Sequence, residues 1–245
     1  MFRIASFGKS DRGLKRSNNE DAFLVDESLG INVLADGMGG AAAGELASGI
    51  FAQAALEVFS NHHQSAQAGL EAQELLQKVY VLAHSRILKH VKANPEHRGM
   101  GCTAELLFLH DDKFSLGHIG DSRTYLYRRG QLKLLTKDHS LVQQQLDQGL
   151  ISRDQAKVHR YRNVLLRAVG TGEALAVDFL KGKVAPGDMF LLCSDGLTSL
   201  VDDGRIQEVL ASDPDISAKI DTLIDLAKSA GGHDNVTVIL SEVSQ

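Results

Sequence analysis

The sequence lacks tryptophan, and aromatic residues make up only 5% of its 245 positions. A folded core must therefore be built from Leu, Val, Ile and Ala, and the apolar share of 43% is ordinary for a globular protein. No stretch approaches the ~20 apolar residues that a membrane-spanning helix needs. The first residues, MFRIASFGKSDRG, also lack the apolar run of a secretory signal. Only two cysteines occur, Cys102 and Cys193, and both lie in apolar runs, which favours buried thiols in a reducing compartment. These absences predict a cytoplasmic globular protein.

Positive charge is also in short supply, because 26 Lys and Arg stand against 31 Asp and Glu, for a net charge of -5. Such a balance argues against broad binding to nucleic acid or to an anionic membrane surface. We find no internal repeat, low-complexity segment or linker, so we expect one domain over residues 1–245. The segment 138–172 is mostly polar, helical in propensity and placed between strand-rich blocks. It is expected to form a small inserted flap.

Apolar residues recur at helical spacing in three segments, which are 46–59, 75–91 and about 216–228. Residues 100–135 instead predict a run of hairpin-connected strands, with turns at Asp111-Asp112 and Arg129-Gly130. Because strands come in runs and helices come in blocks, the pattern favours the α+β class with antiparallel sheets.

Acidic residues mark the ends of several predicted strands. The apolar runs 31–37, 114–122 and 188–196 lead into Asp36, Asp121 and Asp195, whereas Asp21 and Asp234 stand at the start of such runs. In antiparallel sheets the end of one strand lies beside the start of its neighbour, so all five could gather at one edge. Each acid alone is also typical of a turn or a helix cap. Asp36-Gly37, however, leads into a glycine-rich loop and a helix rather than into another strand.

Gathered carboxylates repel one another and are stable together only with cations. Oxygen ligands favour the hard ions Mn²⁺ or Mg²⁺ over zinc. The simplest design shares Asp36 between two ions about 3.5–4 Å apart, and a hydroxide held between them attacks phosphorus in line. Gly37 fits beside that carboxylate because a residue without a side chain lets its carbonyl approach an ion. Arg16, near Asp21, is a candidate to grip phosphate oxygens, although a solvated surface arginine is the default interpretation.

These residues also belong to six motifs that resemble, in order, those of the PPM family, the metal-dependent type-2C serine/threonine protein phosphatases. The resemblance runs from about residue 8 to 241. The motifs are Arg16-Ser-Asn-Asn-Glu-Asp21, Val33-Leu-Ala-Asp-Gly-Met-Gly-Gly40, Gly101-Cys-Thr103, Ile119-Gly-Asp-Ser-Arg123, Leu192-Cys-Ser-Asp-Gly-Leu197 and Gly232-His-Asp-Asn-Val-Thr237.

The resemblance implies a four-layer αββα sandwich of two antiparallel sheets between helical layers, with the metals at one end. It implies that Asp36 bridges two Mn²⁺ or Mg²⁺ ions, that Gly37 lends its carbonyl, and that Asp195 and Asp234 complete the ligands of the first of these ions. The implied activity is hydrolysis of phosphoserine and phosphothreonine in proteins, in a compact bacterial monomer that opposes a serine/threonine kinase.

Three further residues receive roles by the same resemblance. Asp21 and Glu20 would hold metal-bound waters, and Arg16 would bind the phosphate. Asp121, with Asp195, would hold a third, weaker ion. The resemblance also places a flap over residues 138–172, beside the active site.

One departure from the family leaves the general acid unassigned. Many members carry a histidine just after the Asp-Gly or a few residues later, where this chain has Met38 and Ala41-Ala42-Ala43. His118 and His233 flank acidic motif residues, but a neutral structural histidine is the favoured interpretation of each. Two other readings stay open: a hydrolase of small phosphoesters, and a binding module that has lost catalysis. The second would be expected to lack Asp36, Asp195 or Asp234, and all three are present.

Overall fold

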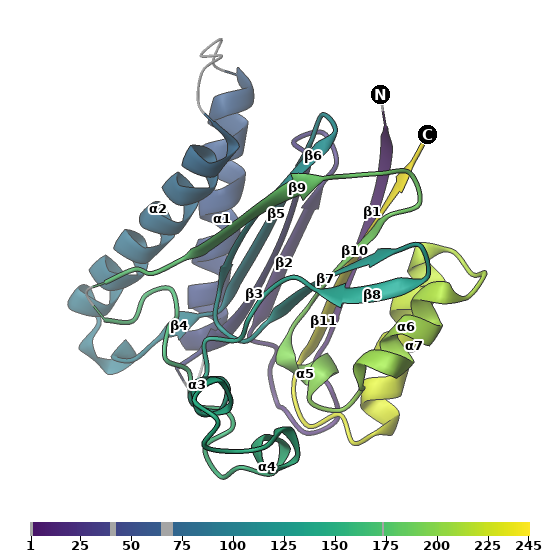
Figure 1. Cartoon of the computed structure of the whole chain (residues 1–245). Coiled ribbons are helices and arrows are strands. Elements are labelled where there is room, and N and C mark those ends of the chain that lie inside the picture. The colour runs from purple at the N-terminus through teal and green to yellow at the C-terminus, as the bar shows by residue number, and fades with distance from the viewer. Residues whose placement is uncertain (1, 40–42, 65–70, 173) are drawn as a thin grey trace.

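The computed structural model describes residues 2–39, 43–64, 71–172 and 174–245, and shows two antiparallel sheets packed face to face between layers of helices (Figure 1). The first sheet has the order β1 (Arg3–Asp11), β11 (Val236–Ser244), β10 (Met189–Cys193), β7 (Arg123–Arg128), β8 (Gln131–Leu134). The second has the order β2 (Asp21–Asp26), β3 (Ile31–Met38), β5 (Ala104–His110), β6 (Lys113–Ile119), β9 (Asp178–Lys183), with the short β4 (Gly101–Cys102) paired to β3.

Two pairs of long helices close the outer faces. Helices α1 (Ala43–Gln64) and α2 (Ala72–Ala93) cover the second sheet, and α6 (Asp203–Ala211) and α7 (Ile216–Ser229) cover the first (Figure 1). The three helices expected from apolar spacing are α1, α2 and α7. Helix α2 ends before Asn94-Pro95, and a 3₁₀ turn (Pro95–His97) follows it. The predicted four-layer αββα sandwich is confirmed.

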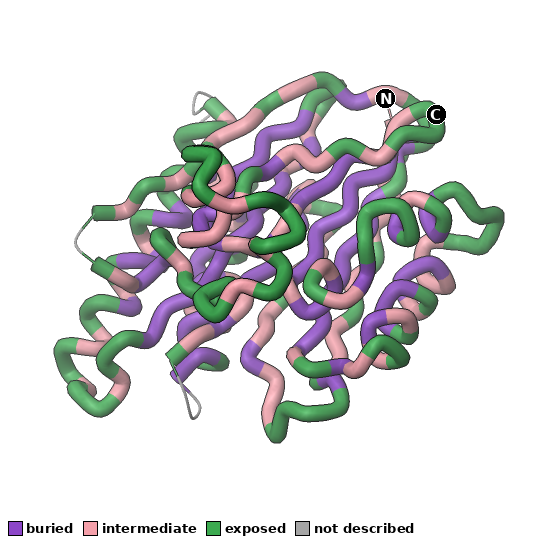
Figure 2. The backbone as a smooth tube through the Cα atoms, turned by 60° about the horizontal axis from the view of Figure 1, so that its bottom comes forward, coloured by how far each residue is buried: buried purple, intermediate pink, exposed green. Residues whose placement is uncertain are grey.

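The core is divided among three apolar clusters, one between the sheets and one under each helical pair. Leu34, Leu107 and Leu116 of the second sheet meet Phe190 and Ile239 of the first. Alternate residues of the same strands face the helices instead, so most central strands are buried on both sides, as the purple strands of Figure 2 show. The rigid strand ends can therefore position side chains at one end of the sandwich.

The connection between β6 and β7 corrects the prediction of consecutive hairpins over residues 100–135. β5 and β6 form a hairpin and so do β7 and β8, but the chain changes sheets between Ile119 and Arg123. Gly120 permits the change: its φ is 114°, and a Cβ there would lie 2.5 Å from Cβ of Thr103. The connection carries Asp121 across the gap between the sheets.

The segment 138–172 contains two short helices, α3 (Leu141–Asp147) and α4 (Arg153–Lys157), neither of which has a buried residue. In Figure 2, where the lower side of Figure 1 comes forward, this segment lies in front of the strand ends and is mostly green or pink. A four-residue helix, α5 (Asp195–Thr198), follows β10.

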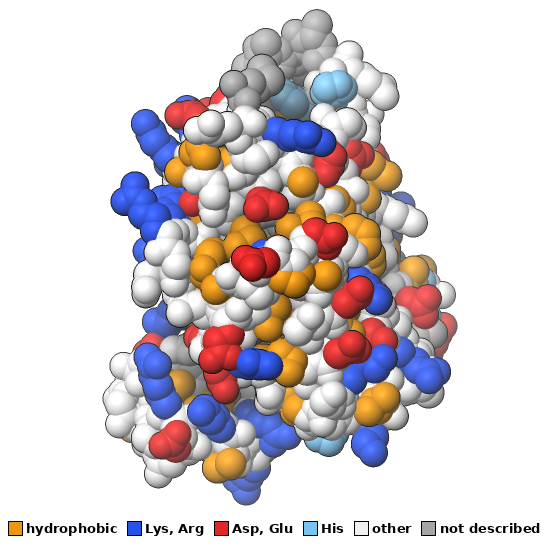
Figure 3. All heavy atoms as spheres, turned by 90° about the vertical axis from the view of Figure 1, so that its right-hand side faces the viewer, with side chains coloured by type: hydrophobic (Ala, Val, Ile, Leu, Met, Phe, Trp, Pro, Cys, Tyr) orange, Lys and Arg blue, Asp and Glu red, His pale blue; other side chains and the backbone are white. Residues whose placement is uncertain are grey.

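On the molecular face formed by α6 and α7, acidic and basic side chains are interspersed around a band of hydrophobic ones (Figure 3). That face carries no extended surface of one sign. Among the described residues, no helix combines the length and apolar character that crossing a bilayer requires.

Candidate metal and phosphate site

Asp21 and Asp36 lie directly opposite each other on neighbouring strands, because β2 and β3 pair in a register that matches these two residues. The backbone around them is firmly held. The Asp36 N–H donates to Oγ1 of Thr103 at 3.0 Å, and the Asp36 carbonyl accepts from the Thr103 N–H at 2.9 Å. The Gly37 N–H donates to the carbonyl of Glu20 at 3.1 Å. Local strand pairing thus sets two carboxylates side by side.

Asp195 and Asp234 come from the other sheet. Asp195 opens α5 immediately after β10, and Asp234 lies two residues before β11, which is the neighbour of β10. A hydrogen bond from the Ser194 N–H to the carbonyl of Thr237 (3.0 Å) holds these two connections together. The candidate site is therefore assembled between the sheets, with two acids from each.

The electrostatics show that the acids are close enough to repel one another. The pKa of Asp36 is raised well above its usual value by burial and by the charges of Asp21, Asp195, Asp121 and Asp234. Burial is also the main cause that raises the pKa of Asp21 to about 7 and that of Asp195 to about 6. A site with these properties stabilises any bound cation.

Asp121 lies in the crossover between β6 and β7, and its pKa is raised by burial and by the charges of Asp195 and Asp138. It therefore borders the same cluster from the side of the 138–172 segment. Glu20 is 9% exposed and accepts a hydrogen bond from Nδ2 of Asn18 (3.0 Å). Its backbone carbonyl accepts from the Gly37 N–H, and a Cβ at Gly44 would lie 2.5 Å from Oε2 of Glu20.

Arg16 reaches the cluster from the loop before β2. Its Nη2 donates to Oδ2 of Asp234 at 2.7 Å, and its side chain is 48% exposed. The hydrogen bond to Asp234 raises the pKa of Arg16, and the charges of Glu20 and Asp36 add to the effect. A positive group thus stands at the solvent side of the acids.

Three observations test whether these residues fit a hard cation. Oδ1 of Asp21 is buried and has no hydrogen-bond partner among the described residues, although Oδ2 accepts from Ser194 (2.9 Å) and Thr237 (2.6 Å). A Cβ at Gly37 would lie 2.1 Å from the Gly44 carbonyl oxygen, so only glycine fits there. The donors are oxygens throughout. As placed, no three acidic, histidine or cysteine side chains of the described residues form a finished metal site. Since an unpaired buried oxygen and mutually repelling acids both favour a cation, we judge that the residues fit the group.

Four residues that position the acids were not singled out by sequence reasoning: Thr103, Ser194, Asn235 and Thr237. Asn235 is the most connected. Its Oδ1 accepts from the Glu20 N–H (2.8 Å), and its Nδ2 donates to the carbonyls of Arg12 (3.0 Å) and Asn18 (2.9 Å). All four lie inside the quoted motifs, and that position is the only signal that could have found them.

The histidines considered as general acids lie in different surroundings. His118 is fully buried, with both ring nitrogens in contact with protein acceptors. This agrees with the expected structural role but not with the expected neutral ring, because the Glu105 carboxylate outweighs burial and raises the pKa of His118 to about 9. His233 is exposed. Met38 ends β3, while Ala41 and Ala42 lie outside the described residues.

A separate cleft of about 530 Å³ opens between the first turn of α2 and strands β5, β6 and β9. It is lined by Leu76, His110 and Phe179 among others, and by none of the five clustered aspartates. The acid cluster, rather than this cleft, carries the candidate chemistry.

A sequence profile described as "Protein phosphatase 2C" matches residues 11–237. The chain belongs to the protein phosphatase 2C family. Among relatives, "Serine/threonine protein phosphatase PstP" of Mycobacterium tuberculosis is 38% identical over 235 residues, which are 96% of this chain and 44% of that protein. "Serine/threonine phosphatase stp" of Listeria monocytogenes is 37% identical over 240 residues, or 96% of this chain and 94% of that protein. The chain thus spans less than half the length of the mycobacterial relative and nearly all of the listerial one.

A solved structure of the PstP catalytic domain, described as being in complex with two manganese ions, superposes on this chain with a TM-score of 0.89. The two are 35% identical, and the match covers 100% of each chain. The predicted membership of the protein phosphatase 2C family is therefore confirmed, as is the fold that this membership implied. The roles of individual site residues remain predictions.

Proposed function

We propose that this chain is a metal-dependent protein phosphatase that hydrolyses phosphoserine and phosphothreonine in proteins. The observation that carries the proposal is the pairing of Asp21 with Asp36 across β2 and β3, with Asp195 and Asp234 brought beside them from the second sheet. A cluster of acids at raised pKa, with Arg16 at its solvent side, suits cation binding followed by phosphate binding. Membership of the phosphatase family supports the same reaction.

In this proposal Asp36 would serve both Mn²⁺ or Mg²⁺ ions, and the Gly37 carbonyl, Asp195 and Asp234 would serve one of them. When bound, the ions activate water for in-line attack on phosphorus and neutralise the phosphate. Asp21 orients water at the edge of the site, because Ser194 and Thr237 fix one of its oxygens and leave the other free.

Arg16 and Asp121 have separate roles. The Arg16 guanidinium exchanges its contact with Asp234 for the phosphate oxygens, to which its planar donors match well. Asp121, with Asp195, holds a third and weaker ion, and Glu20 assists Asp21 with water. The 138–172 segment forms the flap beside this site, within a single domain.

The proposal extends to the substrates, the cellular location and the oligomeric state. The substrates are phosphorylated proteins, modified by a serine/threonine kinase of the same cell in a signalling pathway. The chain acts as a monomer in the cytoplasm. Two cysteines, Cys102 and Cys193, are buried and unpaired, which suits a reducing compartment.

The decisive experiment measures Mn²⁺-dependent phosphate release from a phosphothreonine peptide by wild type and by Asp36→Asn. Removing one oxygen ligand and its charge should reduce kcat at least about 10³-fold, in the range seen when key electrostatic groups of active sites are removed. EDTA should abolish wild-type activity. Asp225→Asn, on the exposed side of α7, changes the net charge equally and should keep normal activity.

Activity that survives in Asp36→Asn or in EDTA would contradict the two-ion proposal. The same assay with p-nitrophenyl phosphate distinguishes a protein phosphatase from a hydrolase of small phosphoesters. A higher kcat/KM for the small ester than for the peptide would favour the latter.

A further inference from the structure

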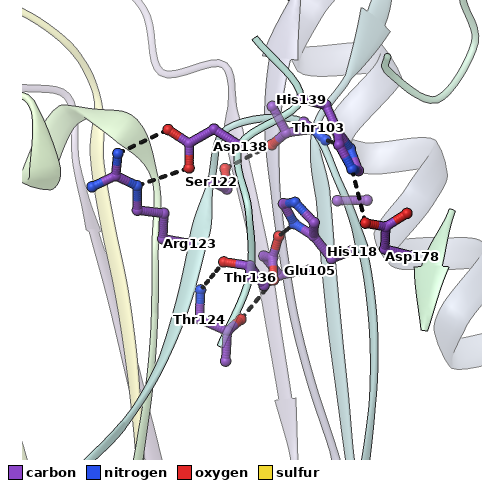
Figure 4. A network of polar contacts seen from close by, with 12 residues as sticks. Thr103, Glu105, His118, Ser122, Arg123, Thr124, Thr136, Asp138, His139 and Asp178 are labelled. Atoms are coloured by element: carbon purple, nitrogen blue, oxygen red, sulfur yellow. Dashed lines mark hydrogen bonds and ion pairs between the residues drawn. The ribbon is translucent and has the colours of Figure 1, made fainter. Parts of the chain in front are cut away.

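Three consecutive residues, Lys137 to His139, run alongside the crossover that carries Asp121, and each of the three contacts the crossover or its flanking strands. Figure 4 shows Asp138 beside Arg123, and His139 near His118. The three residues lie between β8 and α3, where the 138–172 segment begins. We call Lys137–His139 the strap. Its contacts fall on both sides of Asp121 in the chain.

The middle residue of the strap grips the strand that follows Asp121. Arg123 donates from Nε to Oδ1 of Asp138 at 2.9 Å and from Nη2 to Oδ2 at 2.8 Å. This two-point geometry fixes the planes of both groups. The side chain of Asp138 is only 13% exposed and that of Arg123 27%, so solvent weakens the pair less than it weakens a surface salt bridge.

The last residue of the strap holds the crossover on the other side of Asp121. The His139 N–H donates to the Gly120 carbonyl at 2.7 Å, and the Gly120 N–H donates back to Nδ1 of His139 at 3.2 Å. Because Nδ1 accepts, His139 is neutral and carries its proton on Nε2, which faces Asp178 at 3.2 Å. Burial, which lowers the pKa of His139, agrees with that assignment.

The first residue of the strap is anchored deeper, in the space between the sheets. The Lys137 carbonyl can only accept, so Nε2 of His118, 2.9 Å away, must carry a proton. Nδ1 of His118 contacts the Glu105 carboxylate, and the other oxygen of Glu105 accepts from Oγ1 of Thr124 at 2.6 Å. Both His118 and Glu105 are fully buried. Such a pair holds its geometry tightly because a misplaced buried charge is costly.

We propose that Asp138, Arg123 and His118 are positioning residues, which act through the strap to hold Asp121 in place and to link its position to that of the 138–172 segment. The far end of the segment is tied as well. Val169 exchanges two backbone hydrogen bonds with Cys102 (3.0 and 2.9 Å), and Cys102 pairs with Gly37. The 138–172 segment is thus attached beside Asp121 at its start and beside Asp36-Gly37 at its end. When a substitution breaks a contact of the strap, Asp121 and the 138–172 segment should both become more mobile.

The first arm of the test needs no metal and no activity. Hydrogen exchange is measured in EDTA on wild type, Arg123→Gln and Asp138→Asn, over peptides that cover 118–124 and 137–141. Exchange in both peptides should quicken about tenfold in both variants, because the amides of Gly120 and His139 lose their fixed partners. The matched control is Asp188→Asn, which breaks another bidentate ion pair at the other end of β7. There Arg128 donates from Nε to Oδ1 of Asp188 at 2.6 Å and from Nη2 to Oδ2 at 2.6 Å. Its exchange in these peptides should stay at the wild-type rate.

The second arm rests on the proposed function and separates positioning from simple charge. If charge alone mattered, the two variants would act in opposite directions. Removing the positive charge of Arg123 would strengthen cation binding at Asp121, and removing the negative charge of Asp138 would weaken it. If the strap positions Asp121, both variants should instead raise the Mn²⁺ concentration for half-maximal rate about tenfold, the usual cost of losing a residue that orients a metal ligand. The KM for the phosphopeptide should change little.

Unchanged exchange in both peptides, or shifts in Mn²⁺ requirement of opposite sign, would overturn the inference. Arg123→Lys keeps the charge with a single contact and serves if Arg123→Gln does not fold; it too should quicken exchange. A wild-type protein without any phosphatase activity would contradict the proposed function, whereas the exchange results would still decide whether the strap exists.

Discussion

At the scale of single residues, the absence of a side chain at Gly37 shapes the site as much as the acids around it do. The closest approaches to a Cβ at this position would be 2.1 Å from the Gly44 carbonyl oxygen and 2.6 Å from the Glu20 carbonyl oxygen. Both neighbours are backbone atoms, which cannot turn aside as a flexible side chain can. The start of α1 and the residue before β2 therefore close directly onto the Asp36-Gly37 peptide.

Gly37→Ala is accordingly expected to destabilise the protein by about 1–3 kcal/mol, the usual cost of forcing an extra carbon into a packed site. It should also lower Mn²⁺ affinity, because Asp36 moves with its neighbour. Urea unfolding and calorimetric titration measure the two effects. Gly49→Ala is the control: it lies in α1, nothing stands within 4 Å of its Cβ position, and it should be neutral or stabilising by up to about 1 kcal/mol. Equal stability of the two variants would refute the steric argument.

At the scale of elements, the buried pair of His118 and Glu105 joins β6 to β5 and both to the start of the 138–172 segment. Burial alone would lower the pKa of His118, but the Glu105 carboxylate more than offsets it and raises that pKa to about 9. The folded protein therefore holds this proton more tightly than the unfolded chain, where the ordinary value is 6.5. The His118 proton therefore stabilises the fold fully below pH 6.5 and loses its contribution as the pH rises through about 9. Burial also raises the pKa of Glu105, so the ion pair weakens again at acidic pH, where that carboxylate takes up a proton.

We therefore expect the free energy of unfolding in EDTA to fall between pH 6.5 and pH 9.5 more steeply in wild type than in His118→Gln, by an amount on the order of 3 kcal/mol. The clustered aspartates titrate in both proteins, so only the difference between the two slopes is informative. His110→Gln is a useful control, since burial lowers the pKa of His110 and its loss should not flatten the slope. Parallel slopes for wild type and His118→Gln would contradict the assigned charge.

The same scale shows what the sequence could and could not predict. Helices α1, α2 and α7 are predictable because each has a continuous buried stripe. The edge strands β1 and β9 escaped prediction because neither contains a buried residue, so neither has a strong hydrophobic pattern. Helix α6 did have signals that were overlooked, namely Asp202 as its N-cap and Ile206, Val209 and Leu210 on one face.

The candidate site was predictable to a similar degree. Its acids stand out because an aspartate at the end of an apolar strand is conspicuous in a sequence. The hydroxyl and amide groups that position these acids are not conspicuous, because they contact segments far away in the chain. They belong to Thr103, Ser194 and Asn235. The strap could not be predicted from the sequence for the same reason. Its existence depends on β6 and β7 lying in different sheets, and a run of hairpins was the simpler interpretation.

At the scale of the whole molecule, the acid cluster lies where the two sheets meet, and cation binding there should stabilise the entire fold. Mn²⁺ at about 100 times its dissociation constant should raise the free energy of unfolding by about 2.7 kcal/mol over the value in EDTA. Urea denaturation measures the increment. In Asp36→Asn it should nearly vanish, whereas Asp225→Asn should keep it. An increment that survives in Asp36→Asn would place the cation elsewhere.

The first and last strands of the chain are neighbours, since β1 pairs along its whole length with β11 (Figure 1). The first sheet therefore stays open until β11 has been made, and Asp234 lies just before that strand. During synthesis on the ribosome, earlier parts of the chain can form the second sheet with α1 and α2, but the first sheet has to wait. A nascent chain thus has no complete acidic cluster until β11 has been made and has joined the first sheet.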